Sequence, residues 1–221
     1  MGATTRPVSA EGRGMTRSID QQTAARRKGH SHVYILVYKP AGVLGDFPDP
    51  EGRPTVRDLV PVPGRLFAAG RLDARTEGLM LLTDDGKVAH RLTHPRYGFE
   101  REYLALVEGK PTLDTLLRVE KGIPMQGWIA KAQRVMIIGP ADGGRTWLRV
   151  IMTEGKKREV RKLLAAVGHP VLRLIRVRFG PLHLGDLEPG QWRFLTEEEV
   201  RTLLQQTRGR ARRARRGRTS R

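Results

Sequence analysis

The sequence predicts an α+β fold built on a mixed, mostly antiparallel sheet, and three observations support this class. Short apolar runs typical of strands are interspersed irregularly with segments of helical periodicity. Gly- and Asp-rich turns between neighbouring runs imply hairpins, which join antiparallel strands. The chain has 221 residues and no internal repeat, so we expect one ordinary domain or two small ones.

Order is expected to begin after a polar N-terminal segment. Residues 1–30 are rich in Ser, Thr, Gly and Arg and lack periodicity, which is typical of a disordered basic arm. Residues 33–38 form an unbroken apolar run, which predicts a strand buried on both faces. The other elements expected in this half are a helical turn at 56–59, strands at 66–69 and 79–83, and a short helix at 87–92.

The second half carries clearer helix signals. Apolar residues spaced i, i+3, i+4 and i+7 from Val160 predict a helix over 156–167 with one core-facing stripe. Thr196 and Glu199 predict a capping box that starts a last helix, which we expect to end at the Arg-rich tail. The remaining expected elements are a helix at 112–119 and strands at 102–108, 134–138, 146–153 and 171–177.

The charge of the chain favours a polyanionic partner. It contains 41 Lys and Arg against 23 Asp and Glu, which gives a formal charge of +18. Residues 208–221 hold eight of the arginines and no acid, so we expect residues 207–221 to form a disordered Arg-rich tail. This balance is typical of proteins that bind nucleic acid.

Several classes of protein are excluded by what the sequence lacks. No apolar run approaches the roughly 18 residues of a membrane span, and the N-terminus lacks the apolar segment of a signal peptide, so a cytoplasmic protein is expected. The absence of cysteine excludes disulfides, thiolate metal sites and thiol catalysis. His90 and His94 have the spacing of a metal pair, but a third ligand is missing, so we expect surface histidines and no metal.

A charged loop between two predicted strands is the first candidate site. Within residues 70–79, Arg71 and Arg75 flank Asp73. In one interpretation this is an ordinary polar loop in which Asp73 pairs with an arginine. In the other, the guanidinium groups keep a catalytic carboxylate ionised and nucleophilic. The loop by itself leaves both interpretations open.

Three further segments would serve the same site if the fold brought them to it. Tyr103 opens a strand after Arg101 and Glu102, and it either packs in the core or stacks on a base. Basic residues opposite the apolar stripe of the 156–167 helix form either a solvated face or a surface for RNA or Asp73, namely Lys157, Arg158, Arg161 and Lys162. On the next strand, basic residues alternate with apolar ones and suit phosphate contacts, namely Arg173, Arg176 and Arg178.

Taken together, these segments resemble the motifs of the ribosomal small-subunit pseudouridine synthase A family. Residues 70–86, GRLDARTEGLMLLTDDG, are similar to the active-site motif of that family, G-R-L-D-x-x-(S/T)-x-G-L-L-L-L-T-x-D-G. Three other motifs occur in the family's order: a K-P-x-G turn at 38–43, K-x-Y at 101–103 with Arg in place of Lys, and E-G-(R/K)-x-x-(Q/E)-V-R at 154–161. The resemblance spans about residues 33–199.

The resemblance implies a pseudouridine-synthase catalytic domain over 31–206, with a bent mixed sheet and two lobes around a central cleft, divided near 95–100. It implies isomerisation of a uridine in ribosomal RNA, which we expect to be large-subunit (23S) RNA, without cofactor or metal. A monomer is expected, because the sequence shows no obvious self-pairing segment. Asp73 would be the catalytic carboxylate, Tyr103 would stack on the base and assist proton transfer, and Arg161 would pair with Asp73. The residues expected to hold the RNA are Arg71, Lys39, Lys157, Arg158, Arg173 and Arg176.

Two alternatives stay open at the level of sequence. A non-catalytic RNA-binding or ribosome-assembly protein needs the same basic surfaces, although it gains nothing from an acid in a phosphate-lined cleft. The same activity on small-subunit or transfer RNA is also compatible with the motifs, because such enzymes recognise shape. The combination of Asp73, Tyr103 and Arg161 favours an enzyme.

Overall fold

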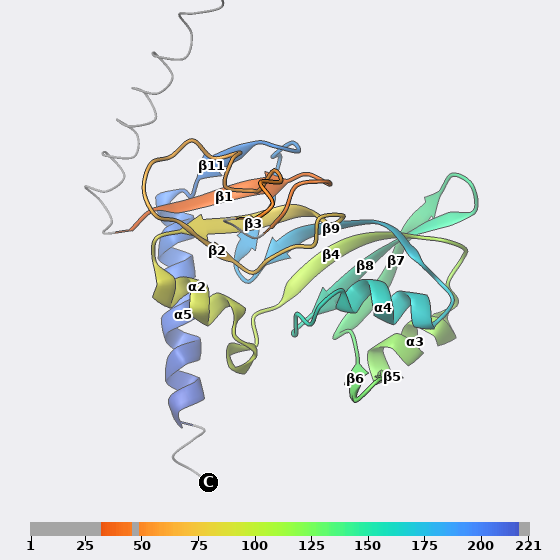
Figure 1. The fold of residues 1–221 in the computed structure, drawn as a ribbon. Helices are drawn as coiled ribbons and strands as arrows, with labels where there is room; N and C mark the ends of the chain where they lie inside the picture. Colours follow the sequence, from red (N-terminus) through yellow and green to blue (C-terminus); the bar gives the residue numbers. More distant parts are fainter. Residues whose placement is uncertain (1–31, 46–48, 217–221) are drawn as a thin grey trace, which may run out of the picture.

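The computed structural model describes residues 32–45 and 49–216, drawn in Figure 1. The strands are β1 (Tyr34–Lys39), β2 (Phe67–Ala69), β3 (Glu77–Thr83), β4 (Arg101–Val107), β5 (Ile123–Met125), β6 (Trp128–Ala130), β7 (Arg134–Ala141), β8 (Arg145–Met152), β9 (Val171–Phe179), β10 (Leu182–His183) and β11 (Trp192–Phe194). The helices are α2 (Gly86–Thr93), the 3₁₀ helix η1 (Pro95–Tyr97), α3 (Leu113–Lys121), α4 (Glu159–Ala166) and α5 (Glu197–Arg216).

In the described part of the chain, one sheet contains nine of these strands. Its main order is β11–β1–β3–β9–β4–β8–β7, with β2 beside β3 and β10 beside β9, and β5 and β6 form a separate hairpin. All neighbours pair antiparallel except β3 and β9, which run parallel. The predicted α+β fold with a mixed, mostly antiparallel sheet is therefore confirmed. None of the described helices is long and apolar enough to span a membrane.

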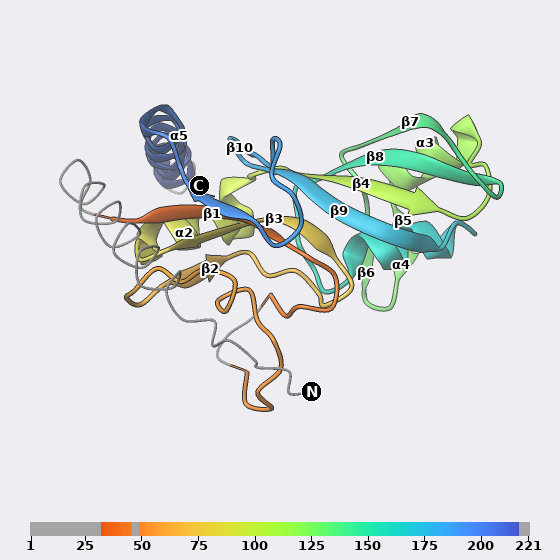
Figure 2. The same cartoon turned by 90° about the horizontal axis from the view of Figure 1, so that it is seen from above.

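The core lies on both faces of this sheet. All six residues of β1 are buried, as predicted, because successive side chains point to opposite faces. Tyr34 and Leu36 face a cluster that α2 and α5 cover, whereas Ile35 and Val37 face a cluster that includes α3 and α4. Figure 2 shows α5 on one side of β1 and β3 and the polypeptide before β2 on the other.

Most predicted elements are present, and the differences have local causes. The strands expected at 134–138 and 146–153 form the β7–β8 hairpin. The helix expected from residue 156 starts at Glu159, because Arg158 adopts a left-handed conformation with φ of 57° and ends a turn. Four strands were missed, and each has only two or three residues, too few to show a periodicity: β5, β6, β10 and β11.

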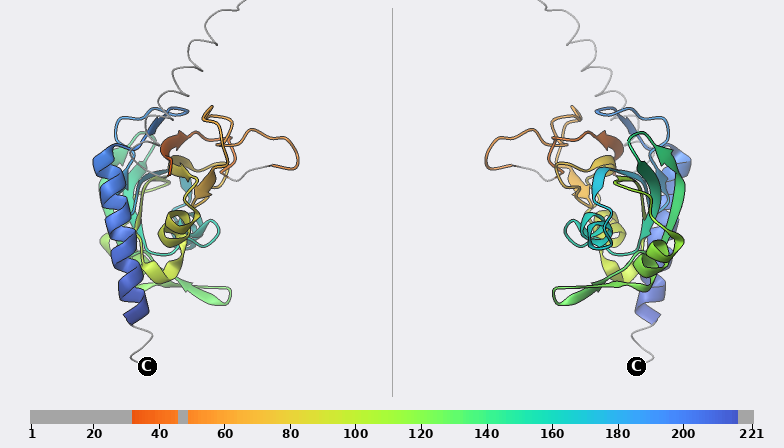
Figure 3. Two further views of the ribbon diagram at one scale, coloured as in Figure 1. Left: turned by 90° about the vertical axis from the view of Figure 1, so that its left-hand side faces the viewer. Right: turned by 90° about the vertical axis from the view of Figure 1, so that its right-hand side faces the viewer.

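The last helix is longer than the sequence suggested. Its predicted capping box is present, since the amides of Thr196 and Glu199 bond reciprocally to the two side chains, at 2.8 and 3.2 Å. The expectation of a disordered tail from residue 207 is wrong for 207–216, which are helical (Figure 3). Thr207 is fully buried, and Ala211 packs against the core at a spacing of i+4. The predicted arm at 1–30 and residues 217–221 lie outside the described residues, and the lobe boundary near 95–100 stays a prediction.

Candidate active site

A cavity of about 580 Å³ opens between the loop before β3, strand β4 and the turn before α4. Six of the nine site residues predicted from the sequence line it: Asp73, Tyr103, Arg71, Lys157, Arg158 and Arg176. The fold thus brings together segments that are far apart in the chain. The other three predicted residues, Lys39, Arg161 and Arg173, lie outside the cavity lining.

The loop between β2 and β3 presents Asp73 to this cavity. Asp73 is half-buried, and the amide of Thr76 donates to its backbone carbonyl at 2.9 Å, which closes a tight turn. Directly after the loop, β3 approaches β9 closely at Gly78, whose φ is +104°. A Cβ there would lie 2.3 Å from the carbonyl oxygen of Arg176, so this approach requires glycine.

Lys39 lies beneath the Asp73 loop and not on an RNA-facing surface. Its side chain is fully buried, and the ammonium donates to the carbonyls of Pro40 and Val43, both at 2.7 Å, and of Ala74, at 3.3 Å. Burial lowers the pKa of Lys39 to about 8, although the carboxylates of Glu77 and Asp73 oppose this shift. The prediction that Lys39 contacts RNA is therefore wrong; it ties the loop after β1 to the Asp73 loop.

Tyr103 lines the cavity next to Arg176, which is a second buried cation after Lys39. It is paired with Arg176 across the β4–β9 ladder, and the two side chains interact. Arg176 is 1% exposed, and its guanidinium donates to the carbonyls of Leu79 and Gly70, at 2.8 and 2.9 Å. The predicted contact between Arg176 and phosphates is corrected accordingly: this guanidinium forms part of the cavity wall and supports the Asp73 loop.

Arg101 is a cavity residue that the sequence analysis did not assign to the site. It is 6% exposed, and its guanidinium lies 4.9 Å from the ring centroid of Phe179. It donates to the carbonyls of Phe99 and Thr93, at 3.2 and 3.1 Å, and burial lowers its pKa. A signal was available, because the period of two along β4 places Arg101 on the same face as Tyr103.

The turn before α4 brings exposed cations to the cavity. Lys157 and Arg158 are both exposed there, where the predicted contact with RNA stays a prediction. The carboxylate of Glu159 is buried, accepts a hydrogen bond from the amide of Lys156 at 3.0 Å, and so closes the turn. Burial raises the pKa of Glu159. Arg71 is exposed on the opposite side, in the Asp73 loop.

Arg161 holds the Asp73 loop from outside the cavity. Its two terminal nitrogens donate to the carbonyls of Val171 and Arg75, both at 2.9 Å, so it links the loop to the start of β9. Burial lowers the pKa of Arg161, and the charge of Asp73 acts in the opposite direction. The two side chains form no direct ion pair, so the predicted pairing is corrected to a backbone tether with longer-range attraction.

Arg173 is engaged by a carboxylate of the protein. Its Nε and Nη2 donate to the two oxygens of Glu77 at 2.8 and 2.9 Å, a bidentate pair between β9 and β3. Arg173 holds the pKa of Glu77 below its usual value. Because the Arg173 guanidinium is already paired with the Glu77 carboxylate, this arrangement disfavours the predicted contact between Arg173 and phosphates.

The cavity therefore combines the Asp73 carboxylate and one tyrosine with several cations and with three further acidic residues, Asp49, Glu154 and Glu159. This set suits nucleophilic or proton-transfer chemistry on a substrate that carries phosphates. Within the described residues, no cluster of three or more His, Asp or Glu could hold a metal ion. His90 and His94 instead lie against each other, with ring centroids 5.2 Å apart.

Comparison with known proteins gives a consistent picture. A family model described as RNA pseudouridylate synthase matches residues 33–166. An RNA pseudouridine synthase of Aquifex aeolicus is 43% identical over 173 residues, which covers 77% of this chain and 69% of that protein. Ribosomal large subunit pseudouridine synthase B of Bacillus subtilis is 38% identical (77% and 71% covered), and synthase E of Vibrio parahaemolyticus is 37% identical (72% of each). A crystal structure of a pseudouridylate synthase superposes with a TM-score of 0.66 at 31% identity, covering 78% of this chain and 74% of that one.

Proposed function

Because this chain belongs to the RNA pseudouridylate synthase family and is thus an isomerase, we propose that it converts a specific uridine of ribosomal RNA into pseudouridine, with Asp73 as the catalytic carboxylate. The juxtaposition of Asp73 and Tyr103 in one cavity with exposed cations at its edge carries this assignment. Large-subunit (23S) RNA is the proposed target, because the relatives from B. subtilis and V. parahaemolyticus are named for that subunit.

Some residues around the cavity would bind the RNA, and others would take part in the reaction. Arg71, Lys157 and Arg158 would hold phosphates next to the target, since they are exposed at the cavity. Their contacts offset the few kcal/mol that flipping a nucleotide out of a helix costs. Tyr103 would stack on the flipped uracil, and its hydroxyl would assist removal of the proton from the carbon that becomes bonded to ribose.

Asp73 would start the reaction by attacking the nucleoside. The glycosidic carbon–nitrogen bond breaks, the uracil turns within the cavity, and a carbon–carbon bond to the ribose forms. The overall change is an isomerisation, so it needs neither an oxidant nor a second substrate. The buried cations Lys39 and Arg176 and the tether Arg161 would keep Asp73 in place by bonding to the backbone of its loop.

A monomer is the proposed active unit. The proposed substrate places the activity in the cytoplasm, where bacterial ribosomes are assembled.

The test compares wild type with Asp73→Asn in cells that lack the protein. Base-resolution mapping of pseudouridine should show one position in 23S RNA that is lost in the deletion strain, restored by wild type and not restored by the variant. The purified variant should bind the RNA about as tightly as wild type, because the amide keeps the shape of the carboxylate. Near wild-type turnover by Asp73→Asn would contradict the assigned role. A lost position in small-subunit or transfer RNA would contradict only the proposed target.

A further inference from the structure

A second cleft, of about 340 Å³, lies between α2, α5 and the start of β1, and we call it the α2–α5 cleft. Its cationic lining comes from two helices, with Lys87 and Arg91 on α2 and Arg208 on α5. His32 lies at the point where the chain enters β1. None of these four residues lines the catalytic cavity.

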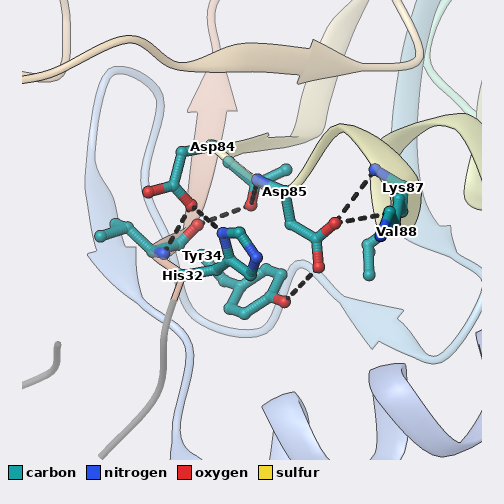
Figure 4. Close-up of polar contacts among 8 residues, drawn as sticks. His32, Tyr34, Asp84, Asp85, Lys87 and Val88 are labelled. Atoms are coloured by element: carbon teal, nitrogen blue, oxygen red, sulfur yellow. Dashed lines mark hydrogen bonds and ion pairs between the residues drawn. The ribbon is translucent and has the colours of Figure 1, made fainter. Parts of the chain in front are cut away.

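The carboxylate inside this cleft forms no direct ion pair with these cations, and its hydrogen bonds come from neutral donors. Asp85 is buried, and it accepts hydrogen bonds from the amides of Lys87 and Val88, both at 3.0 Å, and from the Tyr34 hydroxyl at 2.9 Å (Figure 4). Burial, together with this hydrogen bond, raises the pKa of Tyr34, so the phenol stays a donor. Asp84 at the rim accepts from the Val33 amide at 2.9 Å and is hydrogen-bonded to His32 at 3.2 Å.

The three strong cations of the cleft have no acidic partner in the described part of the chain. The side chains of Lys87, Arg91 and Arg208 form no hydrogen bond or ion pair with another described residue. Other arginines of the same protein are paired, as with Arg193 and Glu199 at 2.7 Å. Three cations that form no direct ion pair and face a single carboxylate, Asp85, leave a net positive potential in the cleft, and an anion relieves it.

The positive surface continues along α5. Arg201, Arg208 and Arg212 are exposed and spaced i, i+7 and i+11, which places them on one face of the helix. The opposite face packs on the core through residues such as Leu203. Two lining residues of the cleft, His32 and Arg208, adjoin the most basic stretches of the sequence, since six Lys and Arg precede His32 and eight Arg lie from residue 208 onward.

We propose that the α2–α5 cleft binds a phosphodiester of the RNA substrate and that the exposed arginine face of α5 continues this contact along the backbone. The inference rests on the proposed function, since it takes RNA as the substrate. Helix α2 connects the two sites, with Thr93 lining the catalytic cavity and Lys87 lining the α2–α5 cleft. These residues are about 9 Å apart along the helix axis. Phosphates of one strand follow at about 3.4 Å along a duplex, so only a few nucleotides separate the two sites.

The experiment measures binding of a 23S RNA fragment over a range of salt concentrations. The variant combines Lys87→Ala, Arg91→Ala and Arg208→Ala. A control combines Lys110→Ala, Lys121→Ala and Arg145→Ala, exposed residues that line neither cleft, and removes the same charge. We expect the variant to bind at least about tenfold more weakly near 0.1 M salt, with a log–log salt slope reduced by about 2–3, because each lost phosphate contact removes about 0.7–0.9. At saturating RNA, kcat should be unchanged while KM rises.

Equal effects of the two triple variants would overturn the proposal, since only overall charge would then matter. If RNA binding is unaffected but binding to polyglutamate falls, the surface serves an acidic protein and the proposal is wrong. Thermal unfolding checks the fold, and the exposed substitution Arg208→Glu, compared with Arg145→Glu, repeats the test without altering a half-buried residue. Failure of wild type to modify the RNA would contradict the proposed function, whereas the salt slopes test this surface independently.

Discussion

Replacing Lys39 with methionine separates the sequence-based role of this residue from its role in the structure. A phosphate-binding lysine acts on RNA affinity and its salt dependence. A buried lysine that donates to the carbonyls of Pro40, Val43 and Ala74 acts on the position of the Asp73 loop. Methionine keeps the length and the apolar part of the side chain and removes only the ammonium. The variant Lys39→Met therefore tests the hydrogen bonds and the charge of that ammonium alone.

Two opposing effects set the expected magnitude. Pro40 and Val43 lose their donor, and each buried carbonyl left unpaired costs about 1–3 kcal/mol. Ala74 keeps the bond from the amide of Gly42, at 2.9 Å. In the other direction, a native pKa of about 8 means that the charged form is held at a cost of about 3 kcal/mol, which methionine removes. At pH 7 the free energy of unfolding should therefore fall by no more than about 3 kcal/mol.

The same numbers predict a pH dependence with a definite sign. Between pH 8 and about 10.5, native Lys39 releases its proton while the unfolded chain retains it, so the unfolded state binds more protons and stability rises with pH. The difference in unfolding free energy between wild type and Lys39→Met should thus shift in favour of wild type across this window. Urea titrations of both proteins at pH 7, 8, 9 and 10 measure it, and groups common to both proteins cancel.

The matching activity measurement is made at pH 7. Turnover by Lys39→Met should fall at least about tenfold, since a displaced catalytic group costs that much or more, while RNA affinity and its salt slope stay at the wild-type values. A salt slope reduced by about 0.7–0.9 with unchanged stability would refute the reasoning, because it would mean that Lys39 contacts a phosphate.

Two other substitutions test the supports of the site, each with its own control. Arg161→Ala should lower kcat by at least about tenfold, because the Arg75 carbonyl in the Asp73 loop loses its hydrogen bond. The control Lys162→Ala changes an exposed neighbour and should leave kcat unchanged. Equal single-turnover rates for the two variants would contradict the tether. Gly78→Ala should destabilise the protein by roughly 3 kcal/mol or more, because its Cβ would clash with the Arg176 carbonyl. The control Gly139→Ala places its Cβ in open space and should change stability by less than about 1 kcal/mol. Urea unfolding measures both.

The sequence predicts the parts of this site that depend on local pattern. Asp73 lies in a charged loop between two apolar runs, and those runs form β2 and β3. The position of Tyr103 on a strand follows from alternation along β4, and the same alternation also points to Arg101. These features need no knowledge of distant residues, which is why sequence reasoning reaches them.

What the sequence misses depends on neighbours that only the fold supplies. Arg173 looks like a surface cation until β9 places it beside Glu77 on β3. The tail after residue 207 looks disordered because its arginines hide a seam of small residues, Thr207, Ala211 and Ala214, on the buried side of α5. For Arg173 and for the segment after residue 207, the sequence alone fits both an exposed and a packed position. Only the neighbours supplied by the fold distinguish the two.

The cations of this protein thus fall into two groups that net charge cannot distinguish. The first group, Lys39, Arg176 and Arg161, donates hydrogen bonds to backbone carbonyls of the Asp73 loop. Lys157 and Arg208 are exposed at clefts. Removing a cation of the first group should change kcat or stability and leave the salt slope alone, whereas removing one of the second should change the slope and leave the fold alone. The formal charge of +18 therefore overstates the charge available to RNA, because part of it organises the catalytic loop.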